Sequence, residues 1–322
     1  MPDGIEFKEK NYGKTAAVLT AAGGIAAAVG PFAGMTAVSK LDKSFGEDDF
    51  VTVLDGAPVT AGGNALDLSP VEADDYLFGC RSGYEVITGA REAFETIGAR
   101  FGEYGAREVF GKSFESALSP ADLKEIAKSG FNCIVIPVRS FLLFKDEKIN
   151  KKSLRVKRLD KVIKKCSKSG IYVILSLCDA PGFDPARGDF SVFGEGRDSL
   201  SKRNYIVKLW EKLAIHYKDE PAVLAYGLLN TDCIDTEKYG EVFDSLYTRT
   251  EKAIRETGDR HILLGYKNAL PASPSQVLKG DRQESCIYCK PKDFIDVSSD
   301  SFEDMGVKAA ESSKTESFTR LA

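Results

Sequence analysis

Strand-like and helix-like segments alternate between residues 119 and 266, and this alternation most constrains the fold. Four short apolar runs have the length and composition of buried strands: residues 133–138, 170–175, 223–230 and 261–265. The segments between them carry apolar residues at helical spacing, as in residues 154–163. Strands that alternate with helices in this way form a parallel sheet covered by helices. The chain is therefore predicted to be an α/β protein.

The regions outside this alternation divide the chain into three parts. Residues 1–45 form an N-terminal extension that is rich in Ala and Gly. Residues 296–322 are rich in Ser, Asp, Glu and Lys and are predicted to form a polar C-terminal tail. Residues 46–295 hold the predicted domain, in which the apolar spacing of residues 84–114 predicts a further helix.

The segment at residues 226–232 has the sequence Tyr-Gly-Leu-Leu-Asn-Thr-Asp. It resembles the fourth barrel strand of family 5 glycoside hydrolases, the cellulase and glucanase family, and residues 75–80 resemble its exo-glucanase branch. The family ends this strand in Asn-Glu-Pro, and the Glu is its catalytic acid/base. This chain has Asn230 at the first of these positions, but Thr231 and Asp232 at the other two. The resemblance is therefore to a hydrolase without its proton donor.

The resemblance extends over residues 75–270 and implies a fold. Residues 119–132 match the family's first helix and the approach to its second strand, and residues 178–182 replace the loop after its third strand. The family belongs to clan A and folds as a (β/α)8 TIM barrel, which takes about 250 residues. We therefore expect a TIM-barrel-like domain over residues 46–295.

Closure of this barrel leaves two alternatives. Six strands can be identified, whereas the family has eight. Either residues 48–60 and 285–310 supply the other two, or the barrel is incomplete and a partner closes it, because an open parallel sheet exposes unpaired edges. We favour a distorted barrel that is capped by the N-terminal extension or by another chain.

The catalytic positions implied by the resemblance carry no catalytic groups. Retaining glycosidases need two carboxyl groups about 5–5.5 Å apart, one as acid and one as nucleophile. Thr231 stands at the acid position, Val135 at that of the Arg that orients the nucleophile, and Cys178 at that of the loop His. No predicted buried strand offers a second carboxylate. We predict no catalytic residue and a vestigial cleft of four residues: Asn230, Asp232, Asp179 and Arg139.

These replacements favour a catalytically inactive barrel that acts as a structural or interaction subunit of a larger assembly, with other protein subunits as partners. One alternative is an active or weakly active β-glucanase with a rearranged site, in which Asp232 would replace the acid. Another is a carbohydrate-binding module, which would need aromatic side chains in the cleft. The one Trp of the chain, Trp210, has helical neighbours that predict a core position, so carbohydrate binding is expected to be weak.

Charge and cysteine content limit the partners and cofactors. A net charge of −4 argues against nucleic acid, and the basic run at residues 145–168 is predicted to be the solvated face of a helix. The seven cysteines are scattered, no Asn-x-Ser/Thr sequon occurs, and the lone pair Cys286 and Cys289 has no nearby His. We predict no metal and no cofactor, and a reducing compartment or membrane association rather than a glycosylated secreted form.

Residues 15–39 contain no charged side chain and are long enough to span a membrane. They are mostly Ala and Gly, so their hydrophobicity is marginal. Three interpretations are open: an anchor to a membrane or a hydrophobic helix, a cleaved leader, and a buried helix-turn pair. We favour the anchor.

Overall fold

The computed structural model describes a defined part of the chain: residues 44–54, 57–73, 80–82, 84–87, 89–116, 118–144, 155–229, 236–264, 286–288, 295–312 and 317–318. The predicted anchor at residues 15–39 lies outside this part. Three of the predicted site residues do so as well: Asn230, Thr231 and Asp232.

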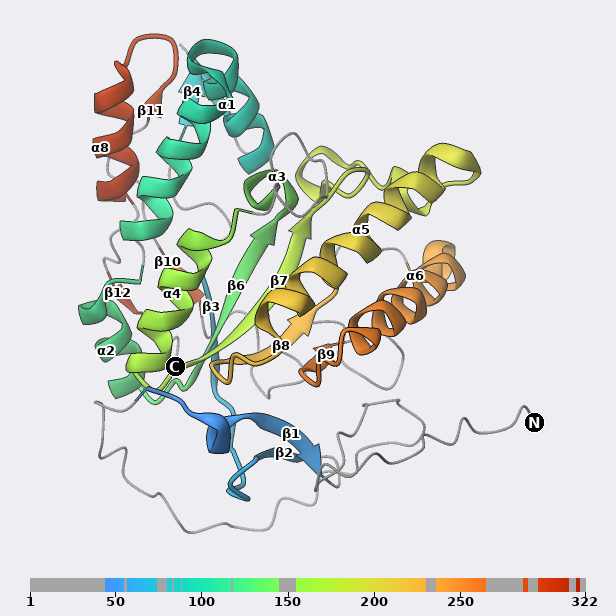
Figure 1. The fold of residues 1–322 in the computed structure, drawn as a ribbon. Helices are drawn as coiled ribbons and strands as arrows, with labels where there is room; N and C mark the ends of the chain where they lie inside the picture. The colour runs from blue at the N-terminus through green and yellow to red at the C-terminus, as the bar shows by residue number, and fades with distance from the viewer. Residues whose placement is uncertain are drawn as a thin grey trace.

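The centre of the protein is a seven-stranded sheet with the strand order β12-β10-β3-β6-β7-β8-β9 (Figure 1). Its strands are β3 (Pro70–Ala73), β6 (Cys133–Arg139), β7 (Tyr172–Asp179), β8 (Val223–Gly227), β9 (Ile262–Leu264), β10 (Cys286–Tyr288) and β12 (Ser317–Phe318). All neighbouring pairs are parallel except β10 and β12. The predicted α/β fold with a parallel sheet is therefore confirmed.

Helices follow the strands and cover one face of the sheet (Figure 1). They are α2 (Pro120–Lys128), α4 (Lys157–Lys168), α5 (Gly196–Tyr217) and α6 (Thr236–Glu256). Helix α1 (Ala90–Ser116) contacts α4, and the short α3 (Ser140–Leu143) follows β6. Strand β6 shows why both faces are buried. Its residues Ile134, Ile136 and Val138 pack on the helical side, and Cys133 and Val135 on the opposite side, because successive strand residues point to opposite faces.

Local sequence explains where helix α2 begins. Ser119 accepts a hydrogen bond on its hydroxyl from the Asp122 backbone N–H at 3.2 Å, and the Asp122 carboxylate accepts one from the Ser119 N–H at 2.8 Å. This capping box satisfies two N–H groups that the helix itself leaves unpaired. Pro120 in the first turn costs nothing, because its missing N–H would have had no partner there.

An antiparallel hairpin, β1 (Val51–Leu54) and β2 (Ala57–Thr60), covers the N-terminal ends of the parallel strands (Figure 1). Just before it, Phe45 stacks on Tyr172 with 4.2 Å between ring centroids, and the Tyr172 hydroxyl donates to the Asp49 carbonyl at 3.0 Å. The hairpin is a separate sheet, so the alternative in which residues 48–60 supply a barrel strand is wrong. The first strand of the parallel sheet is β3, which begins ten residues beyond β2.

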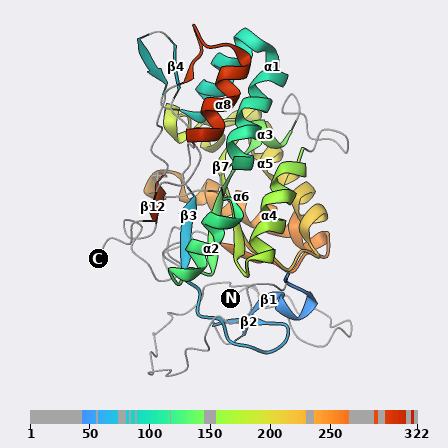
Figure 2. The same cartoon turned by 90° about the vertical axis from the view of Figure 1, so that its left-hand side faces the viewer.

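A second packed unit lies at the other end of the molecule, where α1 runs beside α8 (Phe302–Ser312) (Figure 2). Three short strands join it: β4 (Cys80–Ser82), β5 (Glu85–Ile87) and β11 (Ile295–Asp296). Helix α1 has a kink at Gly102, whose positive φ of 74° suits a residue without a Cβ. The predicted apolar face of this helix is buried here through Ile97, which has no exposed surface.

The structure differs from the predicted polar tail at residues 296–322. Residues of α8 pack against α1, and Met305 and Ala309 are fully buried. These two residues lie four apart, so they form one narrow apolar stripe on an otherwise polar helix. Composition alone hides such a stripe, because its partner surface on α1 is about 200 residues away in the sequence.

Among the described residues, no helix combines the length and the hydropathy that a membrane span requires.

Candidate functional site

The C-terminal ends of the parallel strands are where TIM barrels place their reactive groups. In this chain β6 ends at Arg139 and β7 ends at Asp179, and the two residues are paired in the sheet register. Asp179 is the only one of the four predicted cleft residues that the structure places in a charged cluster at this edge, within the part of the chain that it describes.

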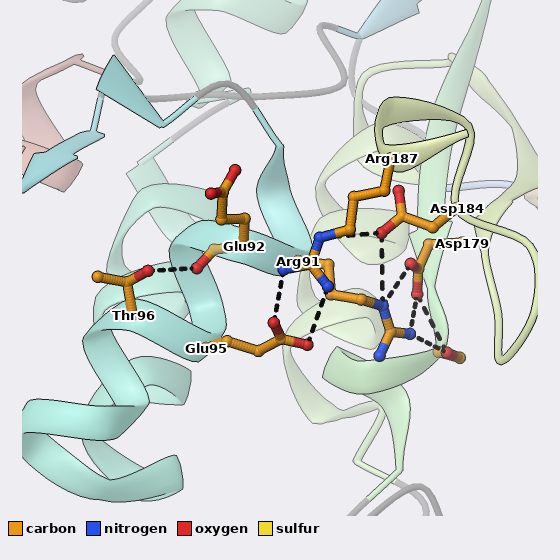
Figure 3. Close-up of polar contacts among 8 residues, drawn as sticks. Arg91, Glu92, Glu95, Thr96, Asp179, Asp184 and Arg187 are labelled. Atoms are coloured by element: carbon orange, nitrogen blue, oxygen red, sulfur yellow. Dashed lines mark hydrogen bonds and ion pairs between the residues drawn. The ribbon is translucent and has the colours of Figure 1, made fainter. Parts of the chain in front are cut away.

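Asp179 is held by Arg91, the second residue of α1 (Figure 3). The Arg91 Nε donates to Asp179 Oδ2 at 2.8 Å, and Nη2 donates to Oδ1 at 2.6 Å. The Ser140 hydroxyl adds a third hydrogen bond to Oδ1 at 3.1 Å. The Asp179 side chain is only 4% exposed and that of Arg91 16%. A bidentate ion pair that is this well buried is strong and geometrically specific.

Asp184 lies beside this pair, in the loop after β7. Its Oδ2 is 4.0 Å from Arg91 Nε and 3.8 Å from Arg187 Nε, and it has no hydrogen-bond partner among the described residues. Burial raises the pKa of the Asp184 carboxyl, and the neighbouring Asp179 charge raises it further, against the opposite effect of Arg187 and Arg91. The pKa of Asp184 is therefore higher than that of an ordinary surface carboxyl, so Asp184 holds its proton more strongly.

The cluster continues back to α1 through Arg187. Its Nη2 lies 2.5 Å from Glu95 Oε2 and its Nη1 lies 3.3 Å from Oε1 (Figure 3). Five residues of alternating charge thus connect α1 with β7 and its loop, and we call them the strand-end ion network: Asp179, Arg91, Asp184, Arg187 and Glu95.

Arg139 does not belong to this network, although it is predicted to share a cleft with Asp179. The Asp179 carboxylate accepts hydrogen bonds from Arg91 and Ser140, while Arg139 lines a pocket between α1 and α4. The structure does not place Arg139 in the charged cluster of Asp179, and the vestigial cleft as a whole stays a prediction.

Val135 and Cys178 are both buried. Val135 packs with Ile174 and Leu224 on the face of the sheet away from the helices. The Cys178 thiol donates to the Ser176 carbonyl at 3.4 Å. Neither residue forms a charged or nucleophilic centre in these contacts. That they replace catalytic groups of the family stays a prediction, as does the role of Thr231.

A separate polar cluster lies at the opposite ends of the strands. Tyr226 donates to Asp259 Oδ2 at 2.8 Å, and His261 Nδ1 lies 2.8 Å from Asp259 Oδ1. Burial raises the pKa of the Asp259 carboxyl, but hydrogen bonds and charge from His261 outweigh it and lower the pKa. All three side chains are fully or almost fully buried, and they fasten β8 to the start of β9.

Sequence reasoning missed Arg91, Asp184 and Arg187. One feature could have indicated Arg91, because a cation in the first turn of a helix opposes the helix dipole and therefore needs an acidic partner. That partner, Asp179, is 88 residues away. Within the part of the chain that the structure describes, no three His, Cys, Asp or Glu side chains are grouped as metal ligands.

Comparisons with known proteins place the chain in a family. The family model "Cellulase (glycosyl hydrolase family 5)" matches residues 97–293, which is more than half of the chain. A β-xylosidase of Phanerodontia chrysosporium is 32% identical over 171 residues, covering 50% of this chain and 34% of that protein. Cellodextrinase A of Ruminococcus flavefaciens is 27% identical over 174 residues, covering 52% of this chain and 48% of that protein.

The match therefore covers a third to a half of the length of these relatives. Among solved structures, an endogalactoceramidase aligns with a TM-score of 0.47 at 17% identity, covering 83% of this chain and 66% of that one. The matched family has the TIM-barrel fold, and the parallel sheet with its helices is consistent with part of such a barrel. The chain belongs to glycosyl hydrolase family 5, the cellulase family.

Proposed function

We propose that this chain is a family 5 glycoside hydrolase barrel without glycosidase activity, which serves as a structural or interaction subunit. One observation carries the proposal: the carboxylate at the end of β7 is closed off by Arg91 and Ser140. Both of its oxygens accept hydrogen bonds from the protein, and its side chain is only 4% exposed.

A glycosidase uses its carboxyl groups differently. The acid must give a proton to the leaving oxygen, and the nucleophile must reach the anomeric carbon. Asp179 is bound to an arginine that cannot give up its proton at any ordinary pH, so it can perform neither role without breaking the ion pair. The position of Val135 supports the same conclusion, because a valine there cannot orient a second carboxylate.

The test is an activity assay on the full chain. We expect no release of sugar or nitrophenol from cello-oligosaccharides, laminarin, xylo-oligosaccharides or aryl β-glycosides above the rate in buffer. An active family 5 relative assayed in parallel serves as the positive control. Turnover that follows the protein through purification would contradict the proposal.

A second candidate, an active hydrolase with a rearranged site, is favoured by Asp184. A buried carboxyl with a raised pKa beside a carboxylate that an arginine holds is a pattern that can supply an acid and a base. Asp184→Asn distinguishes the two candidates. If the wild-type chain shows turnover and this variant abolishes it, the rearranged hydrolase is correct and the scaffold proposal is wrong.

Carbohydrate binding without catalysis is less well supported. The indole of Trp210 is fully buried, and its Nε1 donates to the Leu228 carbonyl at 3.0 Å. It packs against Tyr226 with 5.2 Å between ring centroids. The one Trp of the chain is therefore part of the core, as predicted from its helical neighbours, and offers no stacking surface to a sugar.

A further inference from the structure

A pocket of about 570 Å³ lies between α1, the α3 turn and α4, on the helical side of the sheet. Pockets for small molecules have volumes of about 300–1,000 Å³ and mainly apolar walls. The apolar part of this wall comes from Phe110, Phe114, Val138, Leu142, Leu143 and Leu159. None of the five residues of the strand-end ion network is among its described lining residues, so the pocket is separate from the site at the ends of the strands.

The charged part of the lining is strongly cationic. Its basic residues are Arg107, Arg139, Arg155, Lys157, Arg158 and Lys161, and Glu108 is the single acidic residue among the described lining residues. These described lining residues carry six basic groups against one acidic group, in a chain whose net charge is −4. The excess of positive charge is therefore local, and it attracts anions to this face.

Two of these cations are fixed in position. Arg107 donates to the carbonyl oxygens of Leu142 at 2.9 Å and Phe144 at 2.6 Å, and its Nε donates to Glu103 at 2.7 Å. Arg158 donates to Glu108 at 2.9 Å. A wall whose cations are already ordered loses little conformational freedom when a ligand binds.

Gly111 explains how Arg158 reaches its place. A Cβ at residue 111 would lie 2.0 Å from the Arg158 Cζ, which is far inside van der Waals contact. A glycine on this face of α1 is therefore what allows the guanidinium of α4 to lie against the helix.

We propose that this pocket binds an amphiphilic organic phosphate. Its apolar part would contact Phe110, Phe114 and Leu142, and its phosphate group would contact the basic side chains at the rim. Arginine and lysine make charge-assisted hydrogen bonds to phosphate oxygens, and the apolar wall distinguishes such a ligand from a bare inorganic anion. This proposal goes beyond the scaffold role and does not depend on it.

Octyl phosphate is a suitable probe, because it carries both chemical features. Calorimetric titration of the full chain should show saturable binding at one site. Inorganic phosphate and octyl glucoside each lack one of the two features. The affinity for each should therefore be at least about tenfold lower than for octyl phosphate. Lack of saturable octyl phosphate binding, or equal binding of inorganic phosphate, would overturn the proposal.

Paired variants of α4 locate the site. Lys157→Gln combined with Lys161→Gln should weaken octyl phosphate binding about tenfold, because two cations of the lining are lost. The matched control is Lys164→Gln with Lys168→Gln, which removes the same charge from exposed positions of the same helix that do not line the pocket. Equal weakening in both double variants would show a general charge effect and would refute the assignment of the site.

Vesicles distinguish the two sources of such a ligand. If the ligand is a membrane lipid, the wild-type chain should sediment with phosphatidic acid vesicles but not with phosphatidylcholine vesicles. The Lys157/Lys161 variant should then lose this sedimentation. Octyl phosphate binding without such sedimentation would identify a soluble phosphate ester. Each result supports the pocket as the site, provided that the calorimetric criteria are met.

Discussion

At the scale of single residues, the environment of Asp179 decides how the strand ends can function. A buried carboxylate is stable only when its charge is compensated, and Arg91 provides that compensation through two hydrogen bonds. The pair joins the first turn of α1 to the end of β7. The Asp179 carboxylate is therefore part of the packing between a helix and a strand.

Removing Arg91 should therefore be costly. Arg91→Met leaves the Asp179 charge buried without a partner and should lower the free energy of unfolding by about 3–5 kcal/mol. Adding Asp179→Asn should recover much of this loss. Arg187→Met is the control, because its pair with Glu95 is exposed and should contribute less than about 1 kcal/mol. Urea denaturation measures all four proteins, and an Arg91→Met variant as stable as wild type would contradict this account.

Thr231 provides the sharpest test of lost chemistry. If a nucleophile survives, Thr231→Glu restores the acid and should raise the rate by about 10²–10⁴-fold, the usual contribution of general acid catalysis. We expect no gain in rate on aryl β-glucosides and a modest fall in melting temperature, because the apolar Val135 offers no cation to a new carboxylate. The control is Thr231→Gln, because Gln has the same size as Glu but no acid group. A rate gain confined to the Glu variant would reveal a nucleophile.

At the scale of helices and strands, prediction from the sequence succeeded where a pattern was dense. Strands β6 and β7 are long apolar runs, and α4 has four apolar residues at helical spacing. The local residue pattern is therefore enough to predict these three elements. Strand β3 was not identified, because Pro70 and Glu72 leave only Val71 and Ala73 as apolar residues. Helix α8 was missed for a similar reason. The ion pair between Arg91 and Asp179 depends on the fold and has no local pattern.

Helix α8 should contribute real stability, contrary to what its composition indicates. Met305→Ala removes a fully buried side chain and should cost about 2–5 kcal/mol. Val307→Ala is the matched control, because Val307 is 54% exposed on the same helix and should change stability by less than about 0.5 kcal/mol. Thermal unfolding compares the two variants. If both have the same small effect, α8 does not pack on α1 as described.

At the scale of the whole molecule, the N-terminal region divides into a part that covers the sheet and a part that is predicted to be an anchor. Residues from Phe45 onward cover the lower end of the sheet through contacts with Tyr172, whereas the predicted anchor at residues 15–39 precedes them. An anchor can be removed without loss of the fold only if this cover is retained.

Deletion of residues 1–43 should therefore leave the melting temperature unchanged but convert an associated protein into a freely soluble one. Deletion of residues 1–60 also removes the hairpin and Phe45 and should lower the melting temperature. Fractionation and thermal unfolding of both truncations give the two readouts. Association that persists after the shorter deletion would show that residues 15–39 are not the anchor.

The pairing of β10 with β3 has a consequence for synthesis of the chain. Glu72 is paired with Cys286, which leaves the ribosome 214 residues later. At about 5–20 residues per second, one edge of β3 waits about 10–40 s for its partner, although β6 can cover the other edge much sooner. An unpaired strand edge is a template for association with other chains. The nascent protein therefore passes through an interval in which its own unfinished sheet invites aggregation, and expression at lower temperature or with added chaperones should improve its yield.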